Sequence, residues 1–363
     1  MIFALNLFFS VICSFSFSRF YKVGKNKKFF IYCLFLFPIW FTWLIICGGQ
    51  DGVGTDYESY YKIFSNPDTT LFTYYYKQEY LFAWIVELIN YIELPPQTGF
   101  FIFYLIGFLV ILKIATKLHH NTFFIFVLLF LAYSTAFNNQ LNGLRQYIAL
   151  YWGTLGIMLL YEKKGIVKFI ICIIIACLFH SSSLLFLPFL FFIFYKKNIT
   201  YKFYILFLTT SVLFSLLGSY DWIWKQFDFL IPANYMHYMG GDFDTGHGFT
   251  KMITKLIFIP FYIYSLNLIK YNKLTGYDLY LFKIGFISYC IRLFFMDNII
   301  LNRIGVSLIL ISIFPIYYLL RELYLRKSFG KFHLICLFFV AFYLAKVILF
   351  PTEEYLYNSI YKL

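Results

Sequence analysis

Charged side chains are scarce in this sequence of 363 residues, because Asp, Glu, Lys and Arg together make up only 13% of it. Soluble domains are about a quarter charged. The chain also lacks HExxH, CxxC, P-loop and GxGxxG motifs, which leaves zinc and nucleotide chemistry without support. No stretch is long and polar enough for a separate soluble domain, so we expect residues 1–363 to form a single membrane domain.

Long apolar runs dominate the rest of the sequence. Hydrophobic residues make up 61% of the chain, and many runs approach the roughly 20 residues that a helix needs to cross a bilayer. The pattern predicts an all-α, polytopic membrane bundle of about twelve transmembrane helices. We expect these spans roughly at residues 2–20, 29–48, 98–117, 122–137, 143–161, 166–181, 183–195, 203–218, 251–269, 278–296, 299–320 and 332–350.

The net charge of +13 is concentrated in alternate loops between these spans. Basic loops face the cytoplasm, so this charge indicates topology rather than nucleic-acid binding. Both termini and two longer loops, 49–80 and 219–250, are then expected on the outer side, and the first helix is expected to be retained. The segment 80–96 would break the alternation as a full span, and it is expected to be an interfacial or re-entrant helix.

Five ionisable residues are expected at or near the outer face: Asp56, Arg145, His180, Arg292 and Arg303. Outer arginines are exceptions to the positive-inside rule, and ionisable groups in spans are functional candidates. The guanidinium fork suits phosphate oxygens, so a lipid-linked diphosphate fits both the depth and the charge. Such a diphosphate leaves without protonation. Transfer of a glycan from this donor therefore mainly needs a base for the attacking hydroxyl. Asp56 and His180 have suitable chemistry.

Each of these residues also has a purely structural interpretation. Arg145 can extend to lipid headgroups or pair with an acid, and Arg292 can pair with Asp297. His180 can hydrogen-bond to the backbone, and Asp56 can be a turn residue after Gly54. Most loop tyrosines fit an interfacial aromatic belt, although some can stack on sugar rings.

Four short motifs follow one another along most of the chain, from residue 54 to residue 308: "GTDYESYYKIF", "NGLRQYIAL", "FHSSSLLFLPF" and "NRIGVSL". This ordered set resembles the EpsG family of polysaccharide polymerases, which is allied with Wzy-type O-antigen polymerases. The resemblance implies a bacterial inner-membrane glycosyltransferase. Such an enzyme joins undecaprenyl-diphosphate-linked repeat units of O-antigen or a related surface polysaccharide, with its active site facing the periplasm. Matched by residue, it points to Asp56, Arg145, His180 and Arg303, whereas Arg292 rests on topology alone.

These two lines of inference together predict a mechanism. Arg145 and Arg303, with Arg292 as a further candidate, bind the donor diphosphate. Asp56 is expected to be the base and His180 to assist at the diphosphate, although the reverse assignment stays open. Candidate supporting or sugar-binding residues are Tyr57, Asn142 and Gln146. No metal or other cofactor is expected.

Two other function classes stay open. A flippase for lipid-linked oligosaccharides would carry charge along a cavity open to both sides. An O-antigen ligase, or another lipid-dependent glycosyltransferase, would use the same arginines with a different acceptor. The expected partners are membrane lipid, lipid-linked oligosaccharides and a co-polymerase that regulates chain length.

Overall fold

The computed structural model describes residues 1–23, 31–67, 71–194, 200–216, 249–296, 299–351 and 353–361. Residues 219–248 of the second expected outer loop, and Asp297 and Asn298, lie outside this part of the chain. The described residues are mostly helical, and the β-structure among them is an isolated bridge between Gln50 and Ser359. They group into two compact units, Met1–Leu190 with Leu320–Leu363 and Phe191–Leu319. The prediction of a single membrane domain stays untested.

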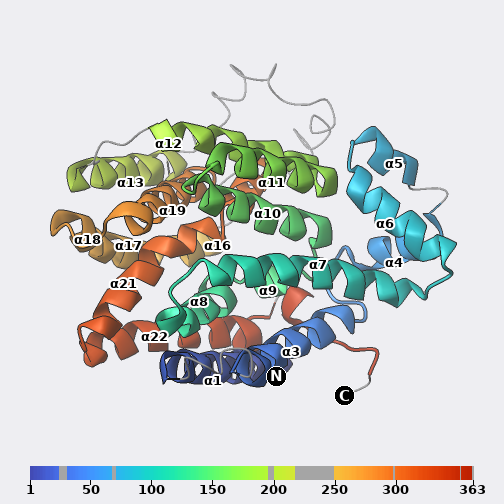
Figure 1. The fold of residues 1–363 in the computed structure, drawn as a ribbon, viewed down its shortest axis with the longest axis horizontal. Helices are drawn as coiled ribbons and strands as arrows, with labels where there is room; N and C mark the ends of the chain where they lie inside the picture. Colours follow the sequence, from blue (N-terminus) through green and yellow to red (C-terminus); the bar gives the residue numbers. More distant parts are fainter. Residues whose placement is uncertain are drawn as a thin grey trace. The chain divides into compact units, whose positions relative to one another are not determined.

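The first unit is built from helices of both chain ends (Figure 1). Its elements are α1 (Ile2–Val23), η1 (Tyr32–Leu36), α3 (Phe37–Gly48), α4 (Tyr57–Ser65), α5 (Leu71–Tyr76), α6 (Tyr80–Tyr91), α7 (Pro96–Thr116), η3 (His120–Thr122), α8 (Phe123–Leu128), η4 (Leu129–Tyr133), α9 (Ala136–Asn139), α10 (Leu144–Leu160), α11 (Gly165–Phe179), η5 (Ser181–Leu190), α22 (Phe329–Leu344), η9 (Ala345–Leu349) and η10 (Glu353–Tyr355). Helices α10 and α11 pack against each other, as do α7 and α10. The short helices α4 and α6 pack together and also contact α7.

The second unit contains the remaining helices. Its elements are α12 (Phe191–Phe194), α13 (Tyr201–Leu216), α16 (Phe249–Leu256), α17 (Ile259–Ser265), α18 (Asn267–Lys270), α19 (Gly276–Phe294), α20 (Ile299–Ser307) and η8 (Ile311–Ile313). Helix α21 (Phe314–Leu325) contains the boundary between the two units. Within this unit, α19 packs against α13 and α20.

The predicted all-α class is confirmed, because every expected span falls largely on helix. Within the described residues, four helices are long and apolar enough to cross a membrane: Ile2–Tyr21, Pro96–Thr116, Met252–Lys270 and Phe329–Leu349. Further apolar helices of 10–17 residues accompany them. These helices indicate a membrane protein, whereas the number of twelve crossings stays a prediction.

Polar groups tie the apolar helices of the first unit together. The indole of Trp43 is fully buried, and its Nε1 donates a hydrogen bond of 2.8 Å to Ser10 Oγ, which joins α3 to α1. Its ring also packs against the rings of Phe130 and Phe137. Helices surrounded by lipid gain little from the hydrophobic effect, so close packing and interhelical hydrogen bonds hold them together.

The amide-rich stretch before α10 belongs largely to this buried network. The side chains of Asn138 and Gln140 are almost completely buried, at 0% and 2% exposure. Gln140 Oε1 accepts a hydrogen bond of 2.9 Å from the Tyr151 hydroxyl, and Asn138 Oδ1 accepts one of 2.9 Å from Tyr343. Buried amides are favourable only when they find such partners. These two amides are therefore structural links between helices.

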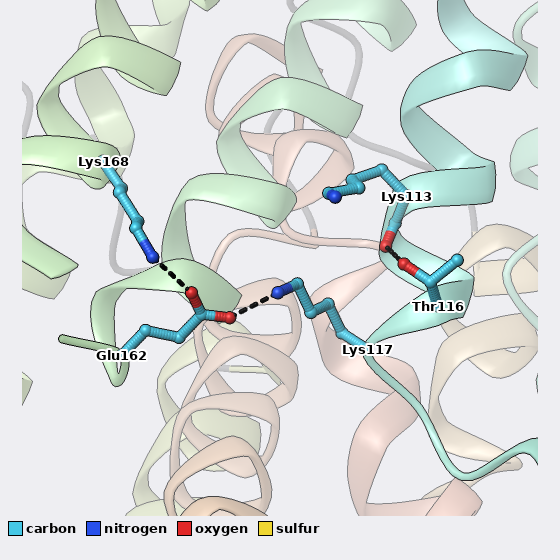
Figure 2. Close-up of polar contacts among 5 residues, drawn as sticks. All are labelled: Lys113, Thr116, Lys117, Glu162 and Lys168. Atoms are coloured by element: carbon cyan, nitrogen blue, oxygen red, sulfur yellow. Dashed lines mark hydrogen bonds and ion pairs between the residues drawn. The ribbon is translucent and has the colours of Figure 1, made fainter.

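An ion-pair cluster joins three helix ends on the side of the basic loops (Figure 2). Lys117, at the end of α7, places Nζ 2.5 Å from Glu162 Oε1, and Lys168 of α11 places Nζ 2.6 Å from Oε2. Glu162 lies two residues after the last residue of α10, Leu160. The hydrogen bonds from Lys117 and Lys168 lower the pKa of the Glu162 carboxyl, despite partial burial that acts in the opposite direction. One carboxylate thus forms ion pairs with two lysines of the basic loops.

We expect Glu162→Gln to destabilise the protein modestly, by about 1 kcal/mol, because partly exposed ion pairs contribute about 0.2–1 kcal/mol each. A carboxyl with a lowered folded-state pKa stabilises the fold above its unfolded-state pKa and loses this effect as pH falls through the folded-state value. The difference in apparent Tm between parent and variant should therefore be full at neutral pH and disappear in acid. A difference that is equally large below the lowered pKa would contradict this role.

Candidate active site

Glu79 is the centre of a buried polar cluster in the first unit. Its side chain is only 1% exposed and lies directly before α6. The chain reaches it through a tight turn in which Gln78 has φ +60, Gln78 N–H donates to the Tyr75 carbonyl and Glu79 N–H donates to the Tyr74 carbonyl. This Schellman motif ends α5 and fixes the backbone that carries the carboxylate.

Arg145 pairs with Glu79 from the first turn of α10. Its Nη1 forms an ion pair with Glu79 Oε2, and its Nε donates a hydrogen bond of 3.4 Å to the Tyr60 hydroxyl. The guanidinium also lies over the Tyr74 ring, with Cζ 4.4 Å from the ring centre, and near the Phe82 ring at 5.1 Å. The side chain is 16% exposed, so the arginine is nearly enclosed by aromatic rings and one carboxylate.

His180 reaches the other oxygen of the same carboxylate. The chain leaves the helical conformation at His180, where α11 ends, and the imidazole is 22% exposed. Its Nδ1 lies 3.1 Å from Glu79 Oε1, which is ion-pair distance, although the geometry falls short of a well-aligned hydrogen bond. The backbone N–H of Ser181 donates to Oε1 at 3.4 Å. One carboxylate therefore holds both the arginine of α10 and the histidine after α11.

These contacts set the charge of Glu79. Burial alone would raise the pKa of this carboxyl, but His180 and the Arg145 charge outweigh burial, and the pKa lies below its ordinary value. Glu79 is therefore an anion at neutral pH. A carboxylate beside Nδ1 favours the imidazole tautomer that carries its proton on Nδ1, which leaves the lone pair of Nε2 as a proton acceptor.

Asp56 lies at the N-terminus of α4 and is linked to the same α10 segment through Asn142. The backbone N–H of Asp56 donates a hydrogen bond of 2.8 Å to Asn142 Oδ1, and the Thr55 hydroxyl donates one of 3.0 Å to the same oxygen. Gly54 has φ +77, and a Cβ there would lie only 2.9 Å from Asn142 Oδ1, so this close approach requires glycine. The carboxylate of Asp56 is on an exposed residue.

Asp56 also lies near the Arg145 cluster, because its loop hydrogen-bonds to Asn142, three residues before Arg145. Burial raises the pKa of Tyr74, whose ring lies under Arg145, and the charge of Asp56 is among the nearby charges that raise it further. The structure thus brings three predicted site residues, Asp56, Arg145 and His180, into one region of the first unit.

The three predicted supporting residues differ in their surroundings. Tyr57 is 3% exposed, donates a hydrogen bond of 3.2 Å to Gln97 Oε1 and stacks on Phe100. These contacts anchor α4 to α7 and favour a supporting role over sugar stacking. Asn142 supports the Asp56 loop, as described above, and Gln146 is half-buried beside Arg145 in sequence.

Arg292 and Arg303 belong to the second unit and are described within it alone. Arg292 Nη1 donates a hydrogen bond of 2.6 Å to Ser312 Oγ. A Cβ added at Gly305, on α20, would lie 3.5 Å from Arg292 Cα, so α19 and α20 pack closely there. Arg303 is exposed on α20. The suggested pairing of Arg292 with Asp297 falls outside the described residues.

Sequence reasoning missed Glu79, which the structure makes the central residue of the cluster. The sequence feature that could have indicated Glu79 is its position directly before the apolar segment of α6, in a chain with few acidic residues. A buried arginine needs a counter-charge. A search for the partner of Arg145 among the acids that border apolar segments would have included Glu79.

Comparison with known proteins identifies one family. The family model described as "EpsG family" matches residues 32–362. This range includes the whole Glu79, Arg145 and His180 cluster, the Asp56 loop and both arginines of the second unit. No curated protein and no solved structure matches the chain.

Proposed function

The chain belongs to the EpsG family, and from this premise we propose that it is an inner-membrane polysaccharide polymerase. Family membership indicates a membrane glycosyltransferase of the polysaccharide-polymerase type. The finer proposal is that it joins undecaprenyl-diphosphate-linked oligosaccharide units at the periplasmic face, as in O-antigen synthesis. The observation that carries it is the convergence of Arg145 and His180 on the buried Glu79 carboxylate, beside the Asp56 loop.

The proposed reaction transfers a growing glycan from its lipid diphosphate to a second lipid-linked unit. A sugar hydroxyl of the acceptor attacks the anomeric carbon of the donor glycan, and the new carbon–oxygen bond replaces the bond to the diphosphate. The hydroxyl proton passes to a protein base, and the electron pair of the broken bond stays on the lipid diphosphate. The diphosphate therefore gains negative charge as it leaves, which a fixed arginine stabilises.

Arg145 is the proposed diphosphate-binding residue. A guanidinium has five N–H donors, and the contacts with Glu79 and Tyr60 use Nη1 and Nε. The aromatic rings around it lower the local polarity and strengthen its attraction for an anion. Arg303 and Arg292 are proposed as further phosphate ligands on the basis of sequence alone.

Two residues remain candidates for the base. Asp56 carries an exposed carboxylate on a fixed loop, and we propose it as the base, with His180 assisting at the diphosphate. The position of Glu79 beside His180 Nδ1 supports the alternative, because an orienting carboxylate is typical of a histidine that accepts a proton through Nε2. The two assignments differ in the activity expected of Asp56→Asn.

Gel analysis of the surface glycan in a strain that lacks this protein tests the proposed reaction. A ladder that collapses to one repeat unit supports the polymerase, and complementation with the parent gene should restore the ladder. Complete loss of the glycan would instead indicate a flippase, and unattached full-length polymer would indicate a ligase. Either of these two results would overturn the proposal.

The proposed orientation predicts which added cysteines react in intact cells. In a background without the native cysteines, Ser59→Cys on the exposed face of α4 should react with a membrane-impermeant thiol reagent. Lys163→Cys and Lys331→Cys lie in expected cytoplasmic loops and should react only after permeabilisation. The opposite labelling pattern would place the Arg145 cluster in the cytoplasm and contradict a periplasmic site.

A further inference from the structure

A cavity in the second unit has a lining unlike that of the Arg145 cluster. It has a volume of about 430 Å³ and lies between the start of α13, the end of α18 with the following turn, and the first half of α19. Figure 1 shows these three helices, and α13 packs against α19. The volume falls within the range of about 300–1,000 Å³ that is usual for small-molecule sites.

Lysines from three different helices line this cavity. Lys202 comes from the first turn of α13, Lys270 is the last residue of α18, and Lys283 comes from the third turn of α19. None of the described lining residues is acidic, and the neutral polar groups are those of Thr200, Tyr201 and Asn272. Scattered basic residues in loops satisfy the positive-inside rule without sharing a cavity. Three lysines around one hollow therefore indicate a site for an anion.

The lysines also lie at different depths. Lys283 is seven residues after the start of α19, so it lies about 10 Å further along the helix axis than Gly276. Lys202 and Lys270 are exposed, whereas Lys283 is half-buried. Apolar side chains, including Leu268 and Leu279, line the rest of the cavity. A ligand with a compact anionic group can thus contact both exposed and half-buried lysines.

Two aromatic rings lie close to the ammonium of Lys270. The ammonium of Lys270 lies 5.9 Å from the ring centre of Tyr201, which itself lines the cavity, and 5.5 Å from that of Tyr271. Cation–π contacts of this kind restrain a flexible lysine at modest strength. The lysine is thereby restrained beside the cavity.

We propose that this cavity binds a phosphate group, carried either by an anionic phospholipid or by a soluble phosphate compound. Ammonium groups form strong, charge-assisted hydrogen bonds to phosphate oxygens. Basic pockets between helices near the cytoplasmic surface also suit anionic lipid headgroups. The site is separate from the proposed polymerase reaction and does not depend on it.

The test titrates the purified full-length protein in detergent with two probes, short-chain phosphatidylglycerol and inorganic phosphate, and follows the apparent Tm. Sodium chloride at matched ionic strength and short-chain phosphatidylcholine, which is zwitterionic, are the control ligands. Saturable stabilisation by phosphatidylglycerol alone identifies a lipid site, and stabilisation by phosphate identifies a soluble ligand. If neither probe stabilises the protein more than sodium chloride and phosphatidylcholine do, the proposal is overturned.

Substitutions of the lining lysines test whether the ligand binds in this cavity. Lys202→Gln with Lys270→Gln should weaken the apparent affinity about tenfold or more, because each change removes a charged hydrogen-bond donor. The control pair Lys113→Gln with Lys331→Gln removes the same charge from exposed lysines outside the cavity and should leave affinity unchanged. Equal losses in both pairs would show general surface attraction and reject the site. Lys283→Met, measured alone, provides an independent variant if the double change impairs folding.

Discussion

Arg145→Lys should abolish polymer formation while the protein still inserts and accumulates in the membrane. Lysine keeps the positive charge beside Glu79 but replaces the planar fork with a point charge. The Nε contact with Tyr60 and the stacking of the guanidinium on Tyr74 are also lost. Removal of one preorganised donor to a developing anion typically costs about 100- to 1,000-fold in rate. The measurement is turnover of a lipid-linked repeat unit by purified protein, with accumulation followed by immunoblot.

The structure provides a matched control for this substitution. Arg326 is 58% exposed and pairs with Glu322 one helical turn away on α21, so Arg326→Lys should leave both polymer and accumulation unchanged. The competing interpretation is that Arg145 serves only as the counter-charge of buried Glu79. Near-normal polymer from Arg145→Lys would support that interpretation and remove Arg145 from the proposed diphosphate site.

The positions of the helices could be predicted because the apolar runs are long and the loops between them carry alternating charge. The segments α1, α7 and α22 fall close to the predicted spans for this reason. The internal structure of the loop 49–80 could not be predicted in the same way. Helices α4 and α5 contain many tyrosines, and their positions depend on packing against α6 and α7.

The candidate site was partly visible in the sequence. Arg145 and His180 were identifiable because ionisable groups are unusual at span ends. Glu79 lay in a polar loop, where a carboxylate is normally solvated, and its burial depends on α10 and α11, which are distant in sequence. The amides Asn138 and Gln140 show the converse. They stand close to Arg145 in the sequence, but they accept hydrogen bonds from the Tyr343 and Tyr151 hydroxyls and so link helices in the buried packing.

Asp56→Asn should reduce turnover by about 100- to 10,000-fold, the usual effect of removing a general base. The substitution keeps the Asp56 backbone N–H that donates to Asn142, and the amide Oδ1 of asparagine can still accept the 3.5 Å contact from the Thr55 hydroxyl. The loop should therefore keep its conformation, and donor binding should persist. Glu58→Gln, two residues further along on the exposed face of α4, is the matched control and should retain activity.

The same assay shows whether Asp56 or His180 is the base, and Glu79→Gln serves as an additional variant. If Asp56 is the base, His180→Gln should retain more activity than Asp56→Asn, because it removes one of several groups at the diphosphate. If His180 is the base, Asp56→Asn should polymerise almost normally, and His180→Gln should be inactive. Glu79→Gln should then also lose activity, since the neutral amide no longer stabilises the protonated imidazole that forms during attack. In both cases Glu79 is also expected to stabilise the fold, because its buried carboxylate contacts Arg145 and His180. Turnover per folded molecule, corrected for accumulation, is therefore the quantity that assigns the base.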